Sequence, residues 1–384
     1  MWRSLASNAL TVLIVLILGV GIVVGWAQSA YRAPGPLAEA ICLGVERGGN
    51  MGDVSMRLAE QNAVSHPALF RLGAEYTDRA EELKAGNFLI PPGASMEAIV
   101  DEITATGQST CGSEINLLIG VASSEVQVRE LDPETRRYTE IAAFAPGDTP
   151  PSAYDSLLED GFGRFRVTLA EGATSWQVAD SLRRAPFLDG NVEFVPDEGT
   201  LAPGSYEVDD GTEREAVLAQ MRERQQEVMA AAWAGRAQDL PLQSASDALV
   251  LASIVEKETG IAEERRRVAG VFVNRLNDGM RLQTDPTVIY GITGGEGVLG
   301  RGLRASELRR ATPYNTYVID GLPPTPIANP GQAAIEAALN PETHDYLFFV
   351  ADGTGGHVFA ETLAEHNGNV RRWREIEAQQ NAGQ

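Results

Sequence analysis

The hydrophobic pattern of the chain begins with one long apolar run near the N-terminus. Residues 10–26 read LTVLIVLILGVGIVVGW, and no charged residue occurs between Ser4 and Tyr31. A helix of this length crosses the ~30 Å hydrocarbon core of a bilayer, and the run exceeds the ~7–15 apolar residues of a typical signal peptide. We therefore predict a cytoplasmic tail and a transmembrane anchor over residues 1–32. A cleaved signal peptide is the alternative interpretation.

Shorter patterns of mixed type follow the anchor. Pro and Gly in Ala33–Pro36 predict a short linker, and a compact module is predicted over residues 38–107. Within that module, helical periodicity marks residues 51–61, and Ser95 is placed to cap a second amphipathic helix. Alternating hydrophobicity then predicts an inserted or linking β-segment over residues 110–160.

The rest of the chain, residues 161–384, mixes strands and helices without a regular βαβ alternation. A strand is predicted at 165–169, a helix at 175–185 and a long charged amphipathic helix at 213–234. Further elements are a helix at 247–258 capped by Ser246, a helix at 262–276, short strands and turns between Gly279 and Gly331, a helix at 332–339, a hairpin at 346–360 and a helix from Leu363. This pattern favours an α+β fold over a doubly wound sheet.

Composition and charge exclude several classes of protein. The chain has 53 Asp and Glu against 31 Lys and Arg, a net charge of −22, whereas a nucleic-acid binder needs a basic stripe. With 43% hydrophobic and 22% charged residues, the chain is too apolar to be disordered overall. Two cysteines, Cys42 and Cys111, are too few for a disulfide scaffold or a Cys-based zinc site. Outside the cytoplasm they could pair with each other.

One motif match and one group of histidines are candidate cofactor or metal sites, and neither has the required context. Gly295–Gly300 matches G-x-G-x-x-G, after the strand-like residues 288–292. Dinucleotide binding requires the third glycine to lie in a helix, which Gly302 and Pro313 disfavour, so we interpret this segment as a glycine loop. The C-terminal histidines show no H-E-x-x-H motif or pair at i, i+4: His344, His357 and His366. We therefore expect neither a metal nor a cofactor.

The string LVLASIVEKETG over residues 249–260 holds two candidate acids, Glu256 and Glu258. Helical periodicity places both beside apolar or small side chains, where burial raises the pKa of a carboxyl and suits it to act as a general acid. Because they are two residues apart, they point to nearly opposite sides of the helix and cannot act together on one bond. The pattern does not choose between them, and a purely structural ion pair, for example with Lys257, fits it equally well.

These residues resemble a known family. LASIVEKETG is followed, in order, by VAGVFVNRLNDGMRLQTDPTVIYG, TPYNTY, GLPPTPIANPG and FFVADGTGGHVF, so that residues 249–367 are covered densely. This succession resembles the endolytic murein transglycosylases of the YceG-like family. The resemblance implies a LysM-like α/β module over 38–107 and a mixed α+β catalytic domain over 161–384. Thr325 stands where the family commonly has glycine.

The resemblance also implies an activity and a site. The family members are membrane-bound lyases that cut the bond between N-acetylmuramic acid and N-acetylglucosamine in nascent peptidoglycan, leave 1,6-anhydro ends and so terminate strand elongation. The catalytic acid falls on Glu256, the first glutamate of the EKE string, with Glu258 as the fallback. Polar residues of the matching motifs are expected to line the glycan groove: Gln283, Asp285, Tyr290, Tyr314 and Asn315. Of these, Asp285 and Asn315 are equally suited to forming turns.

The expected partners are glycan strands, a membrane crossed once and a peptidoglycan synthase, without nucleic acid. The expected location is the inner membrane, with the catalytic domain in the periplasm. Two other functions stay open. One is a non-catalytic peptidoglycan-binding membrane protein. The other is a glycoside hydrolase with two acids, which needs a second carboxyl group ~5–9.5 Å from the first.

Overall fold

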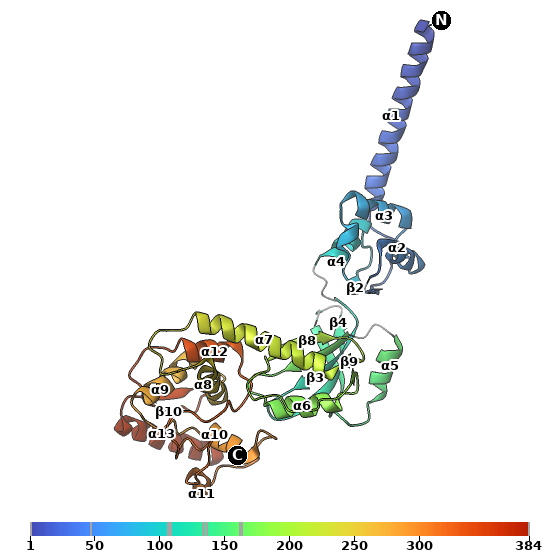
Figure 1. The fold of residues 1–384 in the computed structure, drawn as a ribbon. Coiled ribbons are helices and arrows are strands. Elements are labelled where there is room, and N and C mark those ends of the chain that lie inside the picture. The colour runs from blue at the N-terminus through green and yellow to red at the C-terminus, as the bar shows by residue number, and fades with distance from the viewer. Residues whose placement is uncertain are drawn as a thin grey trace. The chain divides into compact units, whose positions relative to one another are not determined.

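The computed structural model describes residues 2–46, 48–105, 110–132, 135, 137–160 and 164–382. Helices and strands follow one another irregularly along the chain, which confirms the α+β prediction (Figure 1). The chain divides into two compact units, which we describe separately: Met1–Glu114 with Val128–Ile141 and Ser152–Gly163, and Ile115–Gln127 with Ala142–Pro151 and Arg164–Gln384.

The first unit begins with a long helix, α1 (Trp2–Arg32). Its segment Leu13–Arg32 is long and apolar enough to cross a membrane, with a mean hydropathy of 2.2. The large apolar side chains from Leu13 to Trp26 are exposed, as expected for a helix that packs against lipid. The helix therefore fits the predicted single-pass anchor.

A small α/β module follows in the same unit. Its elements are β1 (Ile41–Val45), α2 (Met51–Glu60), α3 (Pro67–Tyr76), a 3₁₀ turn (Ala80–Glu82), β2 (Gly86–Ile90) and α4 (Met96–Thr104). Strands β1 and β2 are antiparallel, and Leu43 and Phe88 form one pair of their register. Both side chains are buried in the core of the module. Ser95 caps α4, as predicted.

A disulfide closes this module. Cys42 on β1 bonds to Cys111, with an S–S distance of 2.07 Å and a Cα–Cα distance of 5.7 Å. The pairing that the sequence allowed is therefore present in the structure.

A five-stranded sheet organises the next part of the chain. Its strands are β3 (Ser113–Ile119), β4 (Ser124–Asp132), β5 (Arg137–Phe144), β6 (Arg164–Leu169) and β8 (Gly204–Val208), in the order β5-β4-β3-β6-β8. Helix α5 (Ser152–Asp160) precedes β6, and α6 (Ser175–Arg184) follows it. Short strands β7 (Leu188–Asp189) and β9 (Thr212–Glu213) pair in parallel. The strands predicted between 110 and 160 thus form one sheet with β6 and β8.

The helical part of the second unit is built around α8 (Ala245–Glu258), whose middle residues are fully buried. Helix α8 packs against α12 (Gln332–Leu339) and α9 (Arg265–Asn277). Helix α7 (Arg214–Ala234) runs between the sheet and these helices and contacts both β9 and α12 (Figure 1). The remaining elements are α10 (Asp285–Thr293), α11 (Ala305–Leu308), the hairpin β10 (Phe348–Ala351) and β11 (His357–Ala360), and α13 (Leu363–Ala382).

Two predictions for this region were wrong. Residues 288–292 are not strand-like but belong to α10, because Pro286 in its first turn favours a helix start and Gly294 ends it in the left-handed conformation. Helix α8 begins earlier than predicted. Its cap is Ser244, which forms a reciprocal capping box with Asp247, so Ser246 lies inside the helix.

Candidate active site

Both glutamates of the EKE string lie in the last turn of α8. The helix is fixed one turn earlier, where the buried Ser253 hydroxyl accepts a hydrogen bond of 3.0 Å from the Ile327 amide. As their spacing predicts, Glu256 and Glu258 contact different elements of the fold. The two candidate acids therefore have separate environments, which can be compared.

Glu256 lies against the start of α12. Its Oε2 accepts a hydrogen bond of 3.0 Å from the backbone amide of Gly331, the residue that caps this helix. Burial raises the pKa of Glu256 and outweighs the Gly331 amide, which lowers it, while the carboxylate of Glu171 raises it further. Oε1 accepts no hydrogen bond from any residue that the structure describes. This arrangement is also that of a helix-capping carboxylate.

The groups beside Glu256 are held closely together. The carboxylate of Glu171 packs so tightly on Gly331 that a Cβ at this position would overlap it. Glu171 also lies 3.7 Å from the Arg265 guanidinium. Neither Glu171 nor Gly331 was identified from the sequence, because neither lies in a pattern that distinguishes it from other turn residues.

A second buried carboxylate, Glu198, lies near Lys257. Its oxygens accept hydrogen bonds from the Ser175 amide at 2.8 Å and the Tyr290 hydroxyl at 3.0 Å. Burial raises the pKa of Glu198, opposed by these hydrogen bonds. Burial lowers the pKa of Lys257, opposed by the carboxylates of Glu256 and Glu198. Glu198 was not predicted as a site residue, because it lies in a loop without periodicity.

Tyr290 and Tyr314, two of the predicted groove residues, lie together beside Glu198. Their ring centroids are 5.0 Å apart, and the Tyr314 hydroxyl lies 2.7 Å from Oγ1 of Thr325. Burial and then the charge of Glu198 raise the pKa of Tyr290, so its hydroxyl stays protonated and can donate. These two tyrosines are therefore grouped with Glu198, not with Glu258.

A buried amide, Asn329, joins the segments beneath this group. Its Nδ2 donates to the Ala173 carbonyl and its Oδ1 accepts from the Leu201 amide, both at 3.0 Å. Asn329 is completely buried. It therefore fixes the turn before α6 relative to the loop that carries Glu198.

Glu258 has a different setting on the other side of α8. Its Oε1 accepts a hydrogen bond from the Thr284 hydroxyl. Burial raises the pKa of Glu258, and the nearby carboxylate of Asp285 raises it further. The Thr284 hydroxyl, His357 and Arg275 lower it. The pKa of Glu258 is raised overall, because burial outweighs the groups that lower it.

Glu258 lines a cavity of about 330 Å³. Two predicted groove residues, Gln283 and Asp285, line the same cavity. The Tyr317 hydroxyl, which the sequence analysis did not single out, donates to Oδ1 of Asp285 at 2.7 Å. The remaining lining residues are Phe272, Arg275, Leu282, Thr284, Phe348, Phe349, Leu363 and His366. The cavity therefore contains two carboxyl groups within a wall of both polar and apolar side chains.

Arg275 and His366 are two of the polar residues in that wall. Arg275 donates to the carbonyls of Leu282 at 2.5 Å and Leu347 at 2.7 Å, and its guanidinium lies 5.4 Å from the centre of the Phe348 ring. His366 stacks on the same Phe348 ring, with ring centroids 5.2 Å apart. Burial, and then the charge of Arg275, lower the pKa of His366, so its imidazole is neutral near pH 7.

Asn315, the fifth predicted groove residue, is buried within its own turn. Its Nδ2 donates to the carbonyls of Glu307, Leu308 and Arg310. Its Oδ1 accepts from the Tyr317 amide at 3.0 Å. Of the two roles considered for Asn315, its contacts are those of a turn former, and the turn places Tyr317.

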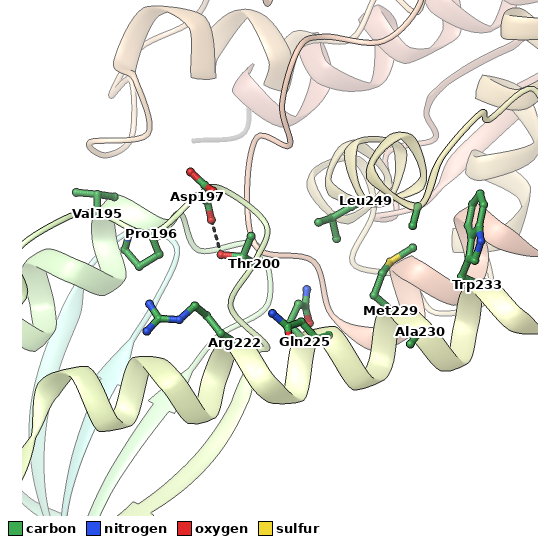
Figure 2. A pocket seen from close by; sticks show the side chains of 12 residues that line it. Val195, Pro196, Asp197, Thr200, Arg222, Gln225, Met229, Ala230, Trp233 and Leu249 are labelled. Atoms are coloured by element: carbon green, nitrogen blue, oxygen red, sulfur yellow. Dashed lines mark hydrogen bonds between the residues drawn. The ribbon is translucent and has the colours of Figure 1, made fainter.

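A larger cavity of about 680 Å³ lies between α7, the loop at 195–200 and the first turn of α8. Figure 2 shows its apolar side chains, including Met229, Trp233 and Leu249, and the hydrogen bond from the Thr200 hydroxyl to the carbonyl of Asp197. Neither glutamate of the EKE string lines this cavity. Of these two cavities, only the smaller one brings a glutamate of α8 into contact with space for a substrate.

Comparisons with known proteins agree with the resemblance in the sequence. The model of the YceG-like family matches residues 142–372, more than half of the chain. The chain is 27% identical over 340 residues to proteins of two Streptococcus pneumoniae strains named endolytic murein transglycosylase, covering 86% of this chain and 58% of theirs. A Bacillus subtilis protein of the same name is 45% identical over 119 residues, 31% of this chain and 32% of the relative.

A solved structure is also similar. It is a putative yceG-like protein from Listeria monocytogenes, with 25% sequence identity and a TM-score of 0.45. The match covers 86% of this chain and 99% of the other.

Proposed function

This chain belongs to the YceG-like family, and from that membership we propose that it is a lytic transglycosylase that cleaves the glycan strands of peptidoglycan. The names of its relatives support this activity, although the chain spans about 58% of the length of the pneumococcal proteins. The observation that carries the proposal is the Glu258 cavity. It combines a carboxyl group of raised pKa with space for part of a substrate.

We assign the general acid to Glu258, the second glutamate of the EKE string. The resemblance to the family places it on Glu256. Burial and a neighbouring carboxylate raise the pKa of both residues, and each accepts one hydrogen bond that lowers it. The two residues differ in their surroundings, because Glu258 lines a cavity whereas Glu256 lies against the start of α12. Glu256 stays the alternative acid, and variants of the two residues distinguish the assignments.

The proposed reaction needs one carboxyl group and no water. Protonated Glu258 donates its proton to the glycosidic oxygen as the bond from C1 of N-acetylmuramic acid to that oxygen breaks. The C6 hydroxyl of the same sugar then bonds to C1. The carboxylate of Glu258 takes up the C6 hydroxyl proton, which restores the acid and leaves a 1,6-anhydro end. Cleavage within nascent strands would terminate their elongation.

Asp285 fits a supporting role in this reaction. Its carboxylate is held by the Tyr317 hydroxyl, so it cannot turn freely toward Glu258. A fixed negative charge in the cavity stabilises the positive charge that develops on the sugar ring as the bond to C1 breaks. Gln283 lines the same cavity and is positioned to hydrogen bond the sugar. Tyr290 and Tyr314 are proposed to contact the glycan farther from the reacting bond.

The rest of the chain is proposed to bring this domain to its substrate. The module over residues 38–107 is proposed to be LysM-like and to bind or orient glycan, because two helices lie between its paired strands. Helix α1 is proposed to anchor the protein in the inner membrane with the catalytic domain in the periplasm. A peptidoglycan synthase is the proposed protein partner.

Analysis of the reaction products tests the activity. Purified sacculi are incubated with the protein, and the released fragments are identified by mass spectrometry. We expect muramyl ends 18 Da lighter than hydrolysis products, because ring closure replaces the addition of water. Reducing muramic acid ends would identify a two-acid hydrolase instead. Binding without release of fragments would identify a non-catalytic peptidoglycan-binding protein.

A further inference from the structure

The anchor helix continues into the folded part of the first unit. Tyr31, in the last turn of α1, is 8% exposed and belongs to the core of the module that follows. Its ring lies directly on Gly73 of α3, where a Cβ of any other residue would overlap the ring. The last turn of α1 is therefore packed into the module as one of its own elements.

Further contacts fix this connection. The Arg32 guanidinium lies 3.2 Å from the carboxylate of Glu97 on α4. Just after the helix, the Gly35 amide donates to the carbonyls of Gly93 and Ala94, both at 3.2 Å. The segment that the sequence predicts to be a linker is thus hydrogen bonded to the module. The anchor helix is therefore connected rigidly to the module, and residues 33–36 do not act as a flexible linker.

The geometry of α1 sets the distance of the module from the membrane. The Trp26 ring, at the end of the apolar run, contacts the His66 ring with centroids 5.6 Å apart. Trp prefers the boundary between hydrocarbon and headgroups. At 1.5 Å per residue, Tyr31 lies about 7.5 Å farther along the axis, which is about the thickness of one headgroup layer. A Trp26 ring at that boundary places His66 at headgroup depth and the core of the module just outside it.

The charge of the turn before α3 suits a membrane surface. The chain has 53 acidic residues, yet residues 61–74 contain none, and Arg71 is their one Lys or Arg. In the turn at residues 61–66, which we call the 61–66 turn, the exposed side chains are polar and uncharged apart from the titratable His66: Gln61, Asn62, Ser65 and His66. An anionic lipid surface repels carboxylates, and this turn offers it none.

We propose that the 61–66 turn contacts the phospholipid headgroups, so that the first unit rests on the membrane surface at a fixed height. The partner is a lipid headgroup layer. The turn contacts it because α1 places the turn at that depth and because the turn carries no negative charge. This inference rests on the membrane anchor and not on the catalytic assignment. It implies that the module over residues 38–107, for which we propose glycan binding, is held close to the membrane, where new strands emerge.

Depth-dependent quenching tests this contact in the full-length protein. Ser65→Cys is labelled with an environment-sensitive dye, and the native cysteines do not interfere because they are paired. The matched control is Tyr76→Cys at the other end of α3, where the side chain is 86% exposed. Gly73 contacts Tyr31 while His66 contacts Trp26, so α3 leads away from the membrane.

The labelled proteins are reconstituted in vesicles of phosphatidylethanolamine and phosphatidylglycerol that contain a lipid with a nitroxide on its headgroup. We expect several-fold stronger quenching at residue 65 than at residue 76. A flexible Gly-Ser insertion after Ala27 separates Trp26 from Tyr31 and should remove this difference while the module stays folded. Equal quenching at residues 65 and 76 in the protein without the insertion would overturn the proposal. So would a lack of quenching at residue 65 in protein that floats with the vesicles.

Discussion

Removing the charge of Asp285 should change the pH dependence of cleavage. Glu258 must be protonated to donate its proton, so activity is lost as the pH rises through its pKa. Burial and then Asp285 raise that pKa. Asp285→Asn keeps the size of the side chain but removes the charge. The pKa of Glu258 therefore falls, and the alkaline limb of the pH–rate profile moves to lower pH.

The repulsion between the two carboxylates sets the magnitude of this shift. Asp285 and Glu258 line the same cavity, and for two carboxylates about 9 Å apart at an effective dielectric constant of about 20 the repulsion is about 1.8 kcal/mol. This corresponds to about 1.3 pKa units. Solvent in the cavity weakens the interaction, so we expect a shift of about one pH unit.

The assay is kcat/KM for release of fragments from sacculi, measured from pH 4 to pH 9 for the wild-type protein and the variant. The matched control is Asp320→Asn, because Asp320 is 81% exposed and pairs with Arg281 on the surface at 2.9 Å. This control should leave the profile unchanged. An alkaline limb that stays in place in folded Asp285→Asn would refute the argument that Asp285 acts on the acid.

Three further predictions concern the support of the site and the module. Tyr317→Phe removes the hydroxyl that donates to the Asp285 carboxylate. It should lower kcat on sacculi about tenfold, with little change in the melting temperature measured by calorimetry. Asn329→Ala leaves the buried Leu201 amide without its acceptor and should lower the free energy of unfolding by about 2–4 kcal/mol, measured by urea denaturation. Reduction of the Cys42–Cys111 disulfide, which spans 69 residues, should destabilise the first unit by about 2–4 kcal/mol, measured by denaturation with and without reductant.

Elements with strong local patterns were predictable from the sequence. The helix predicted at 175–185 is α6, which ends one residue earlier, and the helix predicted at 332–339 is α12. Both have an apolar face that repeats at the helical period, and that face forms part of the core. The apolar run at the N-terminus likewise appears as α1. In each case the local pattern and the tertiary environment agree.

The short element at 288–292 was not predictable in this way. A run of four or five apolar residues fits a buried strand and a buried helix equally well. The capping residues on either side decide in favour of a helix: Pro286 in the first turn and Gly294 after the last. The same limit applies to α8, where Ser246 was predicted as the cap and the reciprocal bond to Asp247 instead selects Ser244.

The site was predictable only in part. The sequence identified both glutamates and their opposite directions, because these depend on the periodicity of one helix. It could not show that Gln283 and Asp285 would join Glu258, while Tyr290 would join Glu198. Such groupings arise from contacts between segments that are far apart in the sequence, and no local pattern encodes them.

The assignment of the acid is tested most directly by comparing Glu258→Gln with Glu256→Gln. The measurement is the rate at which 1,6-anhydro fragments are released from sacculi, followed by mass spectrometry. We expect Glu258→Gln to lower this rate by about 10²–10⁴-fold, because an amide cannot donate the proton. Glu256→Gln should keep most of the activity, since its amide oxygen can still accept from Gly331. Loss of activity in folded Glu256→Gln with an active Glu258→Gln would contradict the assignment, and activity in both would show that neither residue is the acid.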